Sequence, residues 1–301
     1  MKNKLLKSLK VIVTVIVIVF LFDFIFKNWN KTNFTDLSLN PTYLILSILI
    51  FSTYMFLYSA LWWKLLRTLN AKISLQDTNR IYSVSNFYRY IPGRVALLVG
   101  RIFLCSKKGV EKWKTALSLA LEIVLLTIAA VGLFVATLVL YSPYTKLTKA
   151  SLIIAVGIAM VIVVHPILLK SLTTVIIKLT KIKDITSIKY KSLSWITFAY
   201  LLIWILQGTG FYLIISALHD TSIALLPICI GIFAISWAIG YLGILSPGGI
   251  GIREGAIVLL GSQFIPVGAI IAASVLSRLI ITFSEIIFWA VTKVISTSPK
   301  E

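Results

Sequence analysis

At residues 246–254 the chain reads Ser-Pro-Gly-Gly-Ile-Gly-Ile-Arg-Glu, and long apolar runs stand on both sides of this segment. A second segment of the same kind, Tyr-Ile-Pro-Gly-Arg, occupies residues 90–94 beside another apolar run. Lipid gives the backbone no hydrogen-bond partner, so a broken helix in a membrane persists only where protein or a water-filled cavity covers it. The two segments therefore predict helix breaks that belong to a functional site.

The composition is that of a membrane protein. Of the 301 residues 59% are hydrophobic and 13% are charged, and the mean hydropathy of +0.98 lies far above that of soluble domains. Between the apolar runs no stretch is long enough to form a soluble catalytic domain of ordinary size. We therefore expect one all-α, polytopic integral membrane domain over residues 1–301, with no soluble domain.

Seven apolar runs are long enough to cross a hydrocarbon core of about 30 Å. They are Val11 to Phe26, Pro41 to Leu66, Thr115 to Tyr141, Ser151 to Leu169, Ser192 to Leu218, Ser222 to Leu245 and Val267 to Val291. The stretch Ile91 to Cys105 has cations on both sides and predicts a re-entrant or interfacial helix. A short crossing at Ile250 to Phe264 would be the eighth, so we predict 7–8 transmembrane helices with one or two Pro/Gly-broken re-entrant or half-length helices.

The formal net charge of +19 arises mainly from short loops. This distribution argues against nucleic acid as a partner and is typical of a chain oriented by the positive-inside rule. Lys and Arg number 21 before the first run, from Lys64 to Lys114 and from Lys170 to Lys191, against four in the alternate loops. The bias predicts a cell membrane protein with a cytoplasmic N-terminus.

The same charge count places both Pro-Gly segments on the cytoplasmic face. It therefore gives no support to an inverted repeat, in which paired broken helices mark a substrate site. The eight-segment version also places the C-terminus in the cytoplasm, which Lys293 and Lys300 favour.

The first segment carries two arginines seven residues apart, Arg94 and Arg101, which share one face of a helix. Pro92 and Gly93 stand where that helix would begin, next to Tyr90, and an exposed helix N-terminus attracts anions. The functional interpretation is a binding site for a phosphate head group. The alternative is an interfacial helix whose arginines contact lipid phosphates without specificity.

The second segment combines backbone freedom with fixed charge. Pro247 precedes Gly248, Gly249 and Gly251, and Arg253-Glu254 then falls in the first turn of the next helix. This pattern predicts a second anion cradle. In the alternative interpretation Glu254 stabilises the helix dipole and Arg253 anchors the helix at the interface.

Three more charged residues lie within predicted spans: Glu122, Arg278 and Glu285. A charge at the membrane centre costs about 2.5 kcal/mol or more, so each should pair or face water. We expect Glu122 to pair with Arg278 or Arg253. The pair is either a structural contact within the bundle, or the acid couples protons or contacts substrate.

Catalytic and metal sites of known types are not indicated. Cys105 and Cys229 belong to no metal-binding pattern, and His165 and His219 are single residues. No Ser-His-Asp set, metal triad or Walker loop can be assembled at plausible spacings. We expect no cofactor and no metal, and a transporter rather than an enzyme.

The arrangement resembles the lysylphosphatidylglycerol synthase transmembrane-region family, also called flippase-like membrane proteins, over nearly the whole chain. The residues that carry the resemblance are Tyr90 to Arg94, Gly100-Arg101, Glu122, Pro247 to Glu254, and Arg278. In multidomain relatives this region is associated with moving lipid between leaflets, and a separate soluble domain transfers the amino acid. Other relatives are linked to polyprenyl-phosphate glycan pathways. The resemblance thus implies lipid translocation or lipid-carrier handling.

The expected function is a flippase-like transporter of an anionic lipid phosphate, a phospholipid or a polyprenyl-phosphate carrier, taken from the cytoplasmic leaflet. Arg94, Arg101 and Arg253 would bind the phosphate. One alternative is an integral transferase acting on a lipid phosphate, with Glu122 or Glu254 as general base. Another is a non-catalytic membrane subunit that recruits a glycosyltransferase or synthetase through its basic loops.

Overall fold

The computed structural model describes residues 39–90, 95–141, 190–242, 249 and 251–297. Within these ranges the chain is helical and contains no strand. The helices are α2 (Pro41–Thr68), α3 (Leu75–Phe87), η2 (Tyr88–Tyr90), α4 (Val95–Ser106), α5 (Lys112–Tyr141), α8 (Tyr190–Leu218), η3 (Ile223–Leu225), α9 (Leu226–Leu242), α10 (Ile252–Gly261) and α11 (Val267–Thr297). The prediction of an all-α polytopic membrane protein is confirmed.

Five helical segments are long and apolar enough to span a membrane. They are Pro41–Thr68, Lys112–Val139, Lys191–Leu218, Ile223–Tyr241 and Val267–Ile295. The predicted spans Val11 to Phe26 and Ser151 to Leu169 lie outside the described residues. The prediction that Ile250 to Phe264 crosses the membrane is wrong, because α10 has ten residues and a rise of about 15 Å, half of a crossing.

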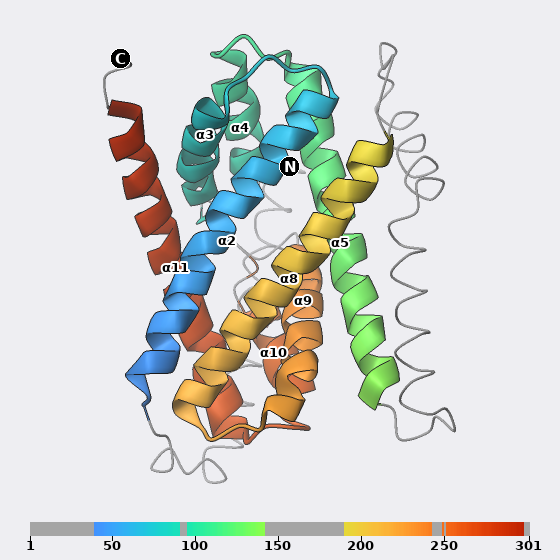
Figure 1. Cartoon of the computed structure of the whole chain (residues 1–301), viewed down its shortest axis with the longest axis vertical. Coiled ribbons are helices and arrows are strands. Elements are labelled where there is room, and N and C mark those ends of the chain that lie inside the picture. Colours follow the sequence, from blue (N-terminus) through green and yellow to red (C-terminus); the bar gives the residue numbers. More distant parts are fainter. Residues whose placement is uncertain (1–38, 91–94, 142–189, 243–248, 250, 298–301) are drawn as a thin grey trace, which may run out of the picture.

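The bundle has two ends, which serve below as reference points. The basic end carries the turns at residues 69–74 and 107–111, which connect α2 to α3 and α4 to α5. The opposite end carries the turns at 219–222 and 262–266, and there the Asn40 N–H donates to the Ala217 carbonyl at 2.9 Å. Helices α2, α5, α8 and α11 run between the two ends (Figure 1).

Helices α3 and α4 form an antiparallel hairpin that enters from the basic end. Ser74 caps the start of α3 by accepting from the Asp77 N–H at 3.0 Å. Lys108, just after α4, pairs with Asp77 at 2.7 Å, whereas Arg101 of α4 contacts Ser85 near the end of α3. The Tyr90 to Arg94 break therefore lies in the connection at the tip of this first hairpin.

Helices α9 and α10 form the second hairpin, which enters from the opposite end. A Cβ added to Gly240, near the end of α9, would lie 2.9 Å from the Cβ of Arg253, near the start of α10. The end of α10 lies beside the start of α11, since a Cβ on Gly261 would meet Ile270 at 2.7 Å. The Pro247 to Gly251 break therefore connects α9 and α10 at the inner tip.

Helix α11 runs beside both hairpins and orders them along the bundle. From its start to its end it contacts Gly261, then Glu254, then Arg89, then Ser83 and finally Gln76. The hairpins thus lie tip to tip within the bundle and enter from opposite ends, as Figure 1 shows for α3–α4 and α9–α10.

This arrangement corrects the prediction that both Pro-Gly segments open on one face. Helix α9 does not exit at the basic end. It stops beside the start of α10, and the chain returns to the end from which it came, so the break lies inside the bundle. Oppositely inserted broken helices are the feature that the charge count had not supported.

The core that supports the hairpins is aromatic. Trp62 of α2 and Trp204 of α8 are fully buried. The Trp204 indole donates to the Leu126 carbonyl of α5 at 3.1 Å. Gly208 lets α8 approach α9 closely, since a Cβ there would lie 2.4 Å from the Ile230 Cα.

Candidate functional site

A cavity of about 170 Å³ lies between the two hairpin tips. This volume is roughly ten times what one water molecule needs. Side chains from α2, α3, α4, α5, α8, α9, α10 and α11 line it. The polar and aromatic ones are Tyr54, Tyr58, Tyr82, Asn86, Arg89, Arg101, Glu122, Gln207, Trp237, Tyr241, Arg253 and Arg278.

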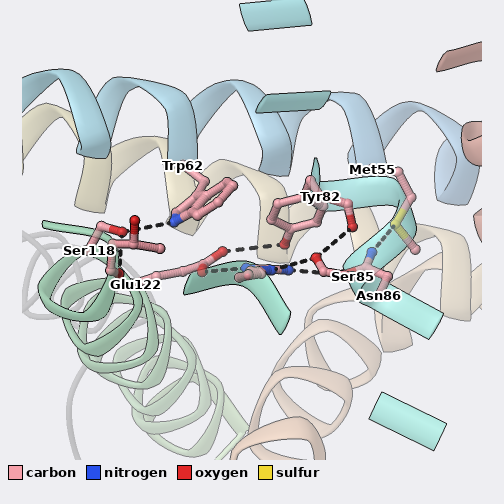
Figure 2. Close-up of polar contacts among 9 residues, drawn as sticks. Met55, Trp62, Tyr82, Ser85, Asn86, Ser118 and Glu122 are labelled. Atoms are coloured by element: carbon pink, nitrogen blue, oxygen red, sulfur yellow. Dashed lines mark hydrogen bonds and ion pairs between the residues drawn. The ribbon is translucent and has the colours of Figure 1, made fainter. Parts of the chain in front are cut away.

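Arg101 forms the centre of a polar network at the basic side of the cavity. Its Nη1 pairs with Glu122 Oε2 at 3.0 Å, its Nε donates to Ser85 Oγ at 2.9 Å, and its Nη2 donates to Asn86 Oδ1 at 3.0 Å. The guanidinium lies 3.9 Å from the Tyr82 ring centroid. Figure 2 shows Tyr82, Ser85, Asn86 and Glu122 converging on this network.

The network fixes α4 against α3 and α5. Tyr82 also donates to the second Glu122 oxygen at 3.3 Å, so both carboxylate oxygens have partners. The expected pairing of Glu122 with Arg278 or Arg253 is wrong. The antiparallel return of α4 brings Arg101 to the depth of Glu122, and that return depends on tertiary packing.

The start of α10 has a conformation that glycine permits. Gly249 and Gly251 have φ values of 72° and 86°, in the left-handed region that other residues rarely adopt. The Gly251 N–H donates to Glu254 Oε2 at 2.7 Å, and Glu254 Oε1 pairs with Arg278 Nε at 3.1 Å. Glu254 therefore both caps α10 and attaches its tip to α11.

Glu285 attaches the other hairpin to α11. It is 1% exposed and pairs with Arg89, in the 3₁₀ turn that follows α3. Sequence reasoning did not include Arg89, although it is a cation only three residues before Pro92. Arg278 and Glu285 do share a face of α11, as expected, but each pairs with a different hairpin.

Arg253 is the arginine of the cavity that has no carboxylate partner. It is 8% exposed, its guanidinium stacks at 4.5 Å from the Phe233 ring centroid, and its Nε and Nη2 donate to no acceptor in the structure. Buried guanidinium groups are normally hydrogen-bonded, because an unpaired buried charge is costly. The arrangement is that of a site for an anion.

Several predicted site residues cannot be placed. Pro92, Gly93, Arg94, Pro247 and Gly248 lie outside the described residues, and so does the side chain of Tyr90. The structure brings together Arg101, Glu122, Arg253 and Arg278 on the cavity wall. Glu254 and Glu285 stand behind this wall as partners of its arginines.

One comparison with known proteins assigns the family. A family model described as "Lysylphosphatidylglycerol synthase TM region" matches residues 8–288. No curated protein matches the sequence at the level required. Because the model covers most of its length, the chain belongs to this family, whose members are integral membrane proteins related to lipid handling.

Proposed function

We propose that this member of the lysylphosphatidylglycerol synthase transmembrane-region family is a flippase-like transporter that moves an anionic lipid phosphate, accepted from the cytoplasmic leaflet. The observation that carries the proposal is Arg253, a buried guanidinium without a carboxylate partner in a cavity at the meeting point of two half-length helix hairpins. The family relation to lipid handling supports it independently.

The position of Arg253 favours a ligand that arrives from the bilayer. The cavity lies between helices that are long and apolar enough to span a membrane, so a phosphate attached to acyl or prenyl chains could reach it while its chains stay in lipid. An ionised phosphate supplies the charge-assisted acceptor that a guanidinium requires.

The roles of the other charged residues follow from their contacts. Arg101 already makes one ion pair and two further hydrogen bonds, so we assign it mainly to positioning the first hairpin. Glu122, Glu254 and Glu285 balance the remaining arginines when no ligand is present. Arg94 stays a predicted second phosphate ligand.

The opposed hairpins suggest how the head group changes sides. Each tip is attached to α11 by one ion pair, Glu254 to Arg278 for the second hairpin and Arg89 to Glu285 for the first. Separation of one pair at a time would open the cavity toward one end while the other stays closed. This is the alternating access typical of transporters with paired broken helices.

The proposal is tested in vesicles of phosphatidylcholine that contain a fluorescent phosphatidylglycerol. The purified chain should accelerate movement of the dye-bearing lipid between leaflets. Arg253→Ala should lower the rate at least tenfold, because a charge-assisted hydrogen bond contributes about 1.5–3 kcal/mol. Arg67→Ala is the matched control, since Arg67 is exposed at the end of α2.

Unchanged transport in Arg253→Ala vesicles would remove the assignment of this residue. Two other outcomes would favour the alternatives. Chemical conversion of the lipid by the chain would indicate a transferase, and co-purification of a soluble enzyme without lipid movement would indicate a recruiting subunit.

A further inference from the structure

We infer that the cavity accepts one net negative charge, and that its ligand is therefore a phosphodiester lipid whose head group carries hydroxyls and no ammonium group. The inference rests on the proposed function and narrows the substrate class of the same site. It depends on the charges around the cavity and on which of them are already paired.

The first step is the charge balance. Four described arginines line the cavity, Arg89, Arg101, Arg253 and Arg278. Three glutamates compensate three of them: Glu285 pairs with Arg89, Glu122 with Arg101 and Glu254 with Arg278. One positive charge remains, and it lies on Arg253. A ligand with a single negative charge would neutralise the group.

The second step concerns head groups that contain an ammonium. Both oxygens of Glu122 accept hydrogen bonds, from Arg101 and Tyr82. Both oxygens of Glu254 are likewise used, by Gly251 and Arg278. A choline or ethanolamine head group would enter without a carboxylate to receive it, and its net charge of zero would leave the group of seven uncompensated.

The third step concerns phosphomonoesters. Their second pKa is about 6, so at pH 8 nearly all molecules carry two negative charges. Arg253 can neutralise only one of them, and the second would be buried beside Glu122 and the hydroxyls of Tyr54, Tyr58, Tyr82 and Tyr241. A phosphomonoester would therefore bind as its monoanion, whose fraction falls as the pH rises.

The last step is the chemistry of the remaining wall. Gln207 donates to the Tyr58 hydroxyl at 3.3 Å, and Trp237 and Tyr241 stack with ring centroids 5.2 Å apart. Neutral hydroxyl and amide groups beside aromatic faces suit a head group that carries hydroxyls. This wall adds no further charge to the balance.

Binding of short-chain lipids to the full chain in neutral detergent tests the inference, with tryptophan fluorescence as the signal. Dioctanoyl phosphatidylglycerol should bind with the same Kd at pH 6 and pH 8. Dioctanoyl phosphatidic acid should bind roughly fiftyfold more weakly at pH 8 than at pH 6, since its monoanion falls from one half to about one hundredth. Dioctanoyl phosphatidylcholine should bind at least tenfold more weakly than phosphatidylglycerol at both pH values.

Three variants connect the selectivity to its residue. Arg253→Met should weaken phosphatidylglycerol binding at least tenfold, whereas Arg253→Lys, which keeps the charge, should retain the preference for the diester. Arg67→Met should change neither, because Arg67 is exposed at the basic end. A helical circular-dichroism spectrum like that of the unmodified chain shows that each variant is folded.

The outcomes separate this inference from the proposed function. Equal affinity for phosphatidic acid and phosphatidylglycerol at pH 8, or equal affinity for phosphatidylcholine, would overturn the inference and leave a lipid-phosphate transporter standing. Inorganic phosphate binding as tightly as phosphatidylglycerol would show a free anion as the ligand. No binding of any phosphate lipid would overturn the proposed function as well.

Discussion

Replacing Glu122 by Gln should destabilise the protein by about 3–5 kcal/mol, because the change leaves Arg101 buried without its counter-charge. Arg101 is 3% exposed and Glu122 is 5% exposed, so water cannot take over the lost interaction. The amide keeps the shape of the carboxylate, and the effect therefore reports the charge. Arg101→Met should cost a similar amount by leaving Glu122 unpaired.

The double variant distinguishes a pair from two independent residues. With both charges removed, neither remaining side chain is a buried ion, so the double variant should be more stable than the sum of the single losses predicts. We expect a coupling energy of about 2 kcal/mol or more. The measurement is denaturant unfolding in mixed micelles, followed by circular dichroism.

The ion pair between Asp77 and Lys108 is the internal control. Its atoms lie 2.7 Å apart, but the side chains are 33% and 47% exposed, so the equivalent cycle should give less than about 1 kcal/mol. Single losses below 1 kcal/mol at Glu122 and Arg101, or additivity within about 0.5 kcal/mol, would refute the network. Arg101 would then be available as a ligand.

Three further changes should have defined effects. Gly208→Ala should destabilise the protein by about 1–3 kcal/mol in the same unfolding assay, because the added methyl group meets the backbone of α9. Gly240→Ala should displace Arg253, whose Cβ would lie 2.9 Å from the new carbon, and should weaken phosphatidylglycerol binding, measured by fluorescence, more than it lowers helix content. Arg89→Glu and Glu285→Arg should each reduce lipid movement in vesicles, and the double exchange should restore part of it; no restoration would contradict the pairing.

The sequence is informative about the helix breaks for a local reason. Proline and glycine act on the backbone of their own turn, so Gly249 and Gly251 could be assigned positive φ before any neighbour was known. The half-length helices and the arginine beside each break follow from the same local pattern. The membrane class follows from composition alone.

The partners of the buried charges could not be predicted in this way. Any arginine at the depth of Glu122 satisfies the same energetic requirement, and periodicity gives no neighbour across helices. Arg253 and Arg278 were therefore as acceptable as Arg101. The choice depends on the antiparallel return of α4, which sets the depth of Arg101 against α5.

The direction of the second hairpin shows a different limit of sequence reasoning. Two crossings at residues 222–245 and 250–264 would return the chain to its starting side, and so does one re-entrant pair. Charge counts register only the side on which each loop ends, so both versions place the end of α11 at the basic end. The prediction for the C-terminal side agrees with the structure, although the route of the chain does not.

The opposite signs of Arg278 and Glu285 on α11 connect ligand charge to opening in the proposed mechanism. The two residues lie seven positions apart, a rise of about 10 Å, and each attaches one hairpin tip. An anion held by Arg253 approaches the arginines and competes with Glu254 for Arg278, which weakens the attachment of the second tip. A neutral or cationic ligand has no such differential effect, and a ligand shifts a conformational equilibrium only through differential affinity for the two states. Binding and opening then select for the same property of the ligand, its single negative charge.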